Sequence, residues 1–133
     1  MIKQKKKDYK LALTALVFLL IYISIMIGMS LIPGDNLKDS IIPKYSIVLH
    51  FLEFLGLAFV STIVFALFDI EYFFSSITGL ILFMSILTEG LQYFVPGRFF
   101  SVVDLVVNIA GGFTLLLIII LSNILFMRKE GPL

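Results

Sequence analysis

Residues 11–32 read LALTALVFLLIYISIMIGMSLI, an unbroken apolar run without a charged side chain. An α-helix needs about 20 such residues to cross a hydrocarbon core of roughly 30 Å. Three runs of similar length follow, at about residues 46–68, 73–94 and 102–126. As helices, all of these runs pair their backbone groups internally, which lipid requires. The sequence therefore predicts an all-α fold, an integral membrane four-helix bundle that forms a single domain over residues 1–133.

The composition excludes the ordinary classes of soluble protein. Of the 133 residues, 60% are hydrophobic and only 14% are charged, whereas a soluble domain has about 25% charged residues. A chain this short cannot bury so much apolar surface away from water, so part of its surroundings must be lipid. We therefore exclude a soluble enzyme and a nucleic-acid-binding module. The chain has no cysteine, which excludes disulfides, thiol catalysis and cysteine-based metal sites.

The basic residues predict the orientation of the spans. Lys and Arg near span ends favour the cytoplasmic side, whereas acidic residues carry little weight. Seven basic residues flank the two termini, and three flank the opposite side. The seven are Lys3, Lys5, Lys6, Lys7, Lys10, Arg128 and Lys129, and the three are Lys38, Lys44 and Arg98. We expect a multi-pass protein of the cell (plasma) membrane with both termini in the cytoplasm.

Six polar side chains interrupt the apolar runs and are the first candidates for function. An ionisable group at the bilayer centre costs roughly 2.5–3.5 kcal/mol on insertion scales, so such groups usually face the bundle interior or a wet cavity. The six form pairs three or four residues apart, which share one helical face. The pairs are His50 with Glu53, Glu89 with Gln92, and Asp104 with Asn108. At about 1.5 Å per residue, all six lie in one layer roughly 3–10 Å beneath the same, outer membrane surface.

Simpler roles are open for several polar residues. Ser101 and Asp104 have the Ser-x-x-Asp spacing of a capping box, so Asp104 can serve the start of the fourth helix. Arg98, in the loop directly above the layer, can extend to lipid headgroups. The first span offers no counterpart to the layer, because its polar residues Tyr22 and Ser24 are weak candidates.

The run Glu89–Arg98, EGLQYFVPGR, continues to Ser101, Asp104, Asn108 and Gly111-Gly112. This pattern resembles the VanZ-like family of small membrane proteins, and His50-Phe51 matches the histidine–phenylalanine pair of that family. Many members carry Asp-Lys shortly before the histidine, where this chain has Ser46-Ile47. The resemblance implies a multi-pass cell-membrane protein linked to the envelope and to resistance against glycopeptide antibiotics, teicoplanin in particular. It does not imply a reaction.

One class of function for the polar layer is binding or modification of a membrane lipid. The ligand would be an envelope lipid or a lipid-linked cell-wall precursor at the outer leaflet. In this hypothesis Arg98 binds a phosphate, which suits its bidentate geometry. The candidate ligand-binding residues are Glu53, Gln92, Arg98 and Asn108.

Catalysis and a non-catalytic role are both open at this point. If the protein is an enzyme, His50 is the candidate general base, and Glu89 or Asp104 orients it or protonates a leaving group. Alternatively, Glu53, Glu89 and Asp104 hold Mg²⁺, which prefers oxygen ligands; whether a metal binds is not decided by the sequence. The other class is a partner subunit in a homo- or hetero-oligomer, or a small proton-coupled carrier, because intramembrane acids and histidine suit proton relays.

Overall fold

Four long helices make up most of the chain. The computed structural model describes residues 9–34 and 45–129, with side chains described as far as residue 126. The helices are α1 (Tyr9–Ser30), α2 (Ser46–Leu67), α3 (Phe73–Gln92) and α4 (Val102–Lys129). All four are long and apolar enough to cross a membrane, which confirms the predicted all-α four-helix bundle and a multi-pass membrane protein.

The helix bounds differ slightly from the predicted spans. α1 begins at Tyr9 rather than 11, and α4 runs on to Lys129 rather than ending at 126, because no Gly or Pro interrupts either sequence there. α3 ends at Gln92 rather than 94, since Pro96 disfavours helical backbone in the residue before it. Of the basic residues that predict orientation, Lys3, Lys5, Lys6, Lys7, Lys38 and Lys44 lie outside the described residues.

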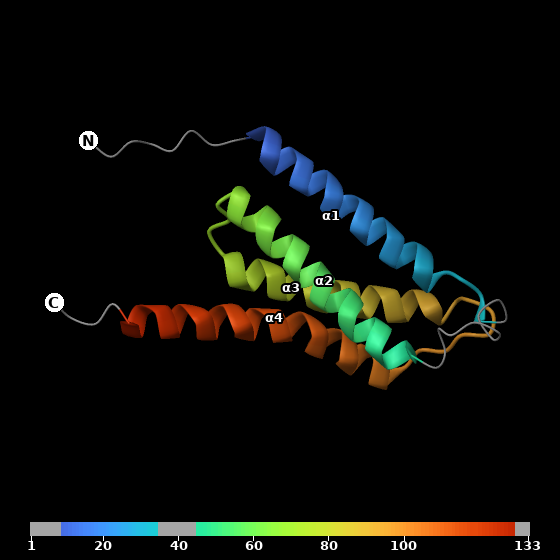
Figure 1. Ribbon diagram of the computed structural model, residues 1–133. Helices are drawn as coiled ribbons and strands as arrows, with labels where there is room; N and C mark the ends of the chain where they lie inside the picture. The colour runs from blue at the N-terminus through green and yellow to red at the C-terminus, as the bar shows by residue number, and fades with distance from the viewer. Residues whose placement is uncertain (1–8, 35–44, 130–133) are drawn as a thin grey trace.

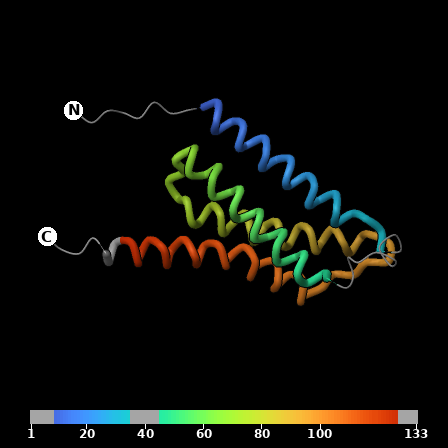
Figure 2. The backbone as a smooth tube through the Cα atoms, in the orientation of Figure 1, coloured from blue at the N-terminus to red at the C-terminus, as the bar shows by residue number. Residues whose placement is uncertain are grey.

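The helices are arranged so that four helix ends meet at one end of the bundle. The end of α1, the start of α2, the end of α3 and the start of α4 lie together, on the right of Figure 1. The start of α1, the α2–α3 turn and the end of α4 lie at the opposite end, as the backbone trace in Figure 2 also shows. α2 packs against all three other helices, and α1 packs against α2 and α3. We call the first of these ends the α3–α4 end.

A tight turn reverses the chain between α2 and α3. The Asp69 N–H donates to the Ala66 carbonyl (3.3 Å), and the Ile70 N–H donates to the Phe65 carbonyl (3.1 Å). With Asp69 in the left-handed region (φ 52°), this is a Schellman motif that satisfies the last carbonyls of α2. The turn therefore sends α3 back to the α3–α4 end.

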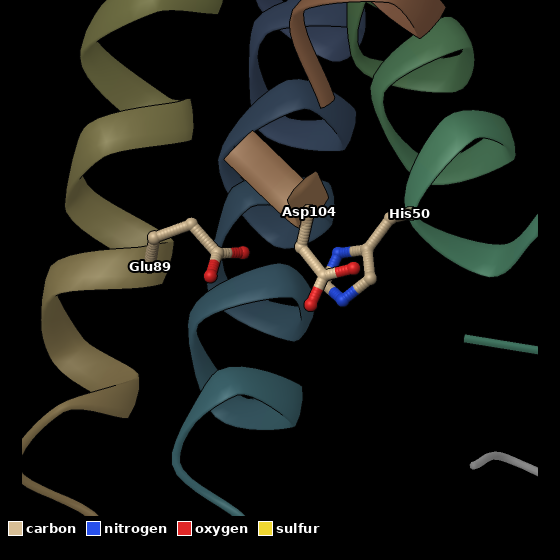
Figure 3. Close-up of side chains that lie close together, drawn as sticks. All are labelled: His50, Glu89 and Asp104. Carbon is tan, nitrogen blue, oxygen red and sulfur yellow. The ribbon is translucent and has the colours of Figure 1, made fainter. Parts of the chain in front are cut away.

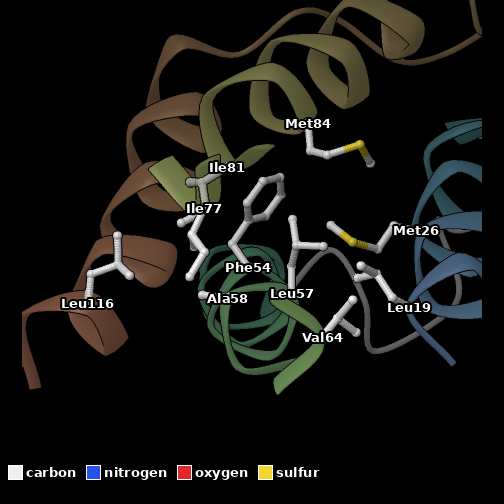
Figure 4. Close-up of a cluster of buried hydrophobic side chains, with 10 residues drawn as sticks. All are labelled: Leu19, Met26, Phe54, Leu57, Ala58, Val64, Ile77, Ile81, Met84 and Leu116. Atoms are coloured by element: carbon white, nitrogen blue, oxygen red, sulfur yellow. The ribbon is translucent and has the colours of Figure 1, made fainter. Parts of the chain in front are cut away.

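The apolar core lies between α1, α2 and α3, with one side chain from α4 (Figure 4). Its buried residues are Leu19, Met26, Phe54, Leu57, Ala58, Val64, Ile77, Ile81, Met84 and Leu116. Between membrane helices, close packing stabilises the contact because lipid is as apolar as the side chains. A Cβ on Gly111 would collide with the backbone of Phe51, and one on Gly112 with the side chain of Ile81. The glycine pair is therefore a close helix-packing site, and it lies one turn beyond Asn108.

Candidate functional site

The turn between α3 and α4 holds the end of α1 through an arginine. The Arg98 Nη1 donates to the Met29 carbonyl at 3.2 Å and more weakly to the Ile32 carbonyl at 3.5 Å. Carbonyls in the last turn of a helix lack partners within the helix, so a cation there is doubly favourable. Arg98 therefore has a structural contact in addition to any contact with a ligand.

Two glycines allow the same turn to approach α1 closely. The Gly34 N–H donates to the Pro96 carbonyl at 3.0 Å. A Cβ on Gly34 would collide with the Gly97 backbone, and Gly97 itself has a φ of 73°, a conformation that glycine adopts without strain. The first span, which offers no polar pair of side chains like those of the other three, contributes backbone carbonyls and one wall of the site instead.

A small pocket opens next to Arg98, and we call it the polar pocket after the six polar residues that line it alongside Met29, Ile32 and Leu49. Its volume is about 60 Å³, which holds a few water molecules or one small polar group rather than a whole ligand. The polar residues that line it come from α1, α2, α3 and the turn between α3 and α4. They are Ser30, Ser46, His50, Glu53, Gln92 and Arg98.

The polar pocket adjoins an apolar groove between α1 and α2. The groove has a volume of about 310 Å³ and is lined by Tyr22, Ile25, Met26 and Leu52, together with Leu49 and Glu53, which also line the polar pocket. The Tyr22 hydroxyl donates to the Glu53 carbonyl at 2.8 Å and lies against Gly56, where any Cβ would collide with it. Tyr22 thus ties α1 to α2 at the inner end of the groove.

Beside the pocket, three ionisable side chains from three helices converge (Figure 3). His50 belongs to α2, Glu89 to α3 and Asp104 to α4. One ligand atom from each lies within 4.8 Å of the other two, and Figure 3 shows both carboxylates directed toward the imidazole. Glu89 is fully buried, whereas His50 and Asp104 are partly exposed. We call these three residues, with Asn108, the acid–histidine cluster.

Glu89 is held by hydrogen bonds from α4 and its N-cap. The Ser101 backbone N–H donates to Glu89 Oε2 at 3.4 Å, and Asn108 Nδ2 donates to Glu89 Oε1 at 3.3 Å. The Asp104 N–H donates to Ser101 Oγ at 3.2 Å, as in the predicted capping box. In a complete capping box, the Asp104 carboxylate would accept a hydrogen bond from the Ser101 backbone N–H. Here Glu89 accepts that hydrogen bond instead. The Asp104 carboxylate is consequently left to face His50.

The carbonyl oxygen of Asn108 accepts no hydrogen bond of good geometry, and its polar neighbour is the His50 imidazole. The residue is 0% exposed, and its Oδ1 is one of two buried side-chain atoms in the described chain that lack a hydrogen bond. The other is Thr62 Oγ1, which belongs to α2. The buried hydroxyls of Ser61, Ser85 and Thr88 instead donate to carbonyls of their own helices. An unsatisfied buried polar atom costs about 1–3 kcal/mol, so the orphan oxygen of Asn108 requires an explanation.

The structure divides the predicted site residues into two adjoining groups at the α3–α4 end. Glu53, Gln92 and Arg98 line the polar pocket, and Glu89, Asp104 and Asn108 belong to the acid–histidine cluster. His50 belongs to both groups. Their catalytic and ligand-binding roles stay predictions.

Sequence reasoning did not propose Ser30 or Ser46 as site residues, and it considered Tyr22 only a weak candidate. Ser46 had a usable signal, since it precedes His50 by four residues and therefore shares its helical face. Ser30 had none, because its place in the pocket depends on how α1 docks against the other helices.

A comparison with protein-family models, curated proteins and solved structures finds no match to this chain. The site is therefore interpreted from its own residues and geometry.

Proposed function

We propose that the protein binds the phosphate-bearing headgroup of an envelope lipid or lipid-linked cell-wall component at the α3–α4 end. In the orientation that the basic residues predict, this end faces the outside of the cell membrane. The observation that carries the proposal is the junction of a small polar pocket with an apolar groove, through Leu49 and Glu53. Such a junction suits an amphipathic ligand, with a polar group in the pocket and a hydrocarbon chain in the groove.

The size of the pocket limits what enters it. About 60 Å³ accommodates one small group such as a phosphate, and a larger headgroup then extends beyond the bundle. The groove, at about 310 Å³, accepts a segment of hydrocarbon chain. Gln92 and Ser46 supply neutral hydrogen-bonding groups at the pocket wall.

Arg98 is the candidate phosphate ligand. Its guanidinium has five N–H donors in a fixed fork, and in the described chain only Nη1 has a protein acceptor. The remaining donors suit a phosphate oxygen, because charge-assisted hydrogen bonds to phosphate are among the strongest. The proposal also includes resistance to glycopeptide antibiotics, which the VanZ-like resemblance implies. The resistance would follow because the protein binds such a lipid at the outer leaflet.

The test compares two lipid probes that differ only in the phosphate. Purified protein in detergent is titrated with a short polyprenyl phosphate and with the matching polyprenol, and binding is followed by native mass spectrometry. We expect the phosphate to bind wild type at least about tenfold more tightly than the alcohol, the equivalent of one charge-assisted hydrogen bond. Equal binding of the two probes would overturn the proposal.

Matched variants locate the binding. Arg98→Gln removes the charge and keeps only a shorter side chain with an N–H donor, so we expect it to abolish the preference for phosphate. Lys129→Gln removes a positive charge at the opposite end of α4 and should leave the preference unchanged. A preference that survives Arg98→Gln, or that falls equally in both variants, would contradict binding at this pocket.

A further inference from the structure

We propose that the acid–histidine cluster is a binding site for a divalent first-row metal ion, with His50, Glu89, Asp104 and Asn108 as ligands. The inference goes beyond the proposed lipid function and does not depend on it, because the ion binds protein side chains directly.

The spacing of the ligand atoms suits one ion. The ligand atoms of His50, Glu89 and Asp104 all lie within 4.8 Å of one another. Nitrogen and oxygen ligands bind such ions at about 2.0–2.2 Å, which places two ligands of one ion roughly 3–4 Å apart. Closing the difference requires rotation of the His50 and Asp104 side chains, which are partly exposed. The three residues come from three helices (Figure 3), so the backbone already brings them together.

Glu89 is already oriented as a metal ligand would be. Each of its carboxylate oxygens accepts one hydrogen bond, from Ser101 or from Asn108. A carboxylate has about four lone-pair sites, so both oxygens can still bind an ion. Hydrogen bonds to a ligating carboxylate are the usual outer shell of a metal site, where they fix its orientation.

Asn108 supplies an independent observation that points to a cation. Its Nδ2 donates to Glu89, which places the amide within the cluster, while its fully buried Oδ1 has no hydrogen-bond partner. Side-chain amide oxygens are common ligands of hard cations. A bound ion would give this buried oxygen, which accepts no hydrogen bond of good geometry, a partner.

The ligand set selects the class of ion. One imidazole nitrogen with three oxygens differs from the all-oxygen sets that Mg²⁺ and Ca²⁺ prefer, and Mn²⁺ or Zn²⁺ accepts both donor types. Two carboxylates neutralise the charge of such an ion. The set also differs from the magnesium hypothesis drawn from sequence, because the structure brings His50 rather than Glu53 into the cluster.

The test measures metal binding by the full-length protein in detergent, with no lipid added. After removal of bound metals with a chelator, the protein is titrated with Mn²⁺, Zn²⁺ and Mg²⁺, and binding is followed by calorimetry. We expect one Mn²⁺ or Zn²⁺ per chain, and Mg²⁺ at least about tenfold weaker, because it gains least from an imidazole. Pulsed EPR of the Mn²⁺ complex should show coupling to an imidazole nitrogen. Absence of stoichiometric binding, or Mn²⁺ without that nitrogen coupling, would overturn the inference.

Three isosteric variants separate ligands from neighbouring charge. Asp104→Asn and Glu89→Gln each remove one carboxylate from the cluster, and either should weaken Mn²⁺ binding at least about tenfold. In Glu89→Gln, a flipped Asn108 amide can still pair with the new side chain, so the fold should survive. Glu53→Gln removes an acid from the adjoining pocket and should change affinity less than about threefold, a small electrostatic effect. Equal loss in all three variants, or none in the first two, would contradict the site.

Discussion

The contact between Gly111 of α4 and the Phe51 backbone of α2 gives a prediction that can be worked from the structure. A Cβ at Gly111 would lie 3.0 Å from the Phe51 carbonyl carbon and 3.1 Å from its Cα, whereas ordinary contacts lie at 3.4–4 Å, and it would collide with the carbonyl oxygen. Backbone cannot rotate away as a side chain does, so Gly111→Ala must push α4 away from α2. Phe51 adjoins His50, and Gly111 lies one turn from Asn108, so the displacement opens the acid–histidine cluster.

The magnitude follows from two opposing effects. Alanine stabilises a helix by about 0.8–1.0 kcal/mol relative to glycine, and overpacking a tight contact costs about 1–3 kcal/mol. The cost should lie at the upper limit here because the obstacle is backbone, so we expect the free energy of unfolding to fall by about 1–2 kcal/mol. Gly79→Ala is the matched control, because a Cβ there meets nothing within 4 Å, and it should be neutral or slightly stabilising.

The assay is reversible unfolding of the purified protein by SDS in mixed micelles, followed by circular dichroism. Gly111→Ala should unfold at a lower SDS fraction than wild type, and Gly79→Ala at the same or a higher fraction. If Gly111→Ala proved as stable as Gly79→Ala, the close approach of α2 and α4 at this glycine would be refuted.

Two further predictions concern single hydrogen bonds and use the same unfolding assay. Ser101→Ala removes the acceptor for the Asp104 N–H at the start of α4, so we expect a loss of about 0.5–2 kcal/mol, as for other helix N-caps. Ser101→Thr keeps the hydroxyl and should recover most of that loss; failure to do so would argue against capping. Tyr22→Phe removes the hydroxyl that donates to the Glu53 carbonyl, and it should cost about 0.5–1.5 kcal/mol. An unchanged stability in Tyr22→Phe would show that this link between α1 and α2 is not formed.

The four helices were predictable because each apolar run is long enough to cross a membrane and the runs are separated by Pro, Gly or charged residues. The shared depth of the polar pairs was also predictable, because it follows from helix rise and the alternating direction of the spans. Helix rise and alternating direction place His50, Glu89 and Asp104 at one end of a bundle, whatever the details of packing.

The partners of individual polar groups were not predictable, because they depend on how the helices dock. The Ser-x-x-Asp spacing correctly indicates the cap at Ser101, yet the carboxylate that accepts the cap N–H comes from Glu89 on another helix. Arg98 binds carbonyls of α1, a contact between residues far apart in the chain. The contribution of α1 was missed for the same reason, since it is made mainly through backbone atoms.

The central claim is that side chains from α2, α3 and α4 meet at one end of the bundle, and cysteine cross-linking tests it most directly. The natural chain has no cysteine, so paired substitutions give an unambiguous signal. His50→Cys with Asp104→Cys, and His50→Cys with Glu89→Cys, are treated in native membranes with a short bifunctional thiol reagent, and linked peptides are identified by mass spectrometry. The control pair, Leu49→Cys with Ile118→Cys, places its second thiol about 21 Å further along α4 than Asp104. Efficient linkage of both test pairs without linkage of the control is the predicted result; test pairs that link no better than the control would contradict the convergence of the three helices.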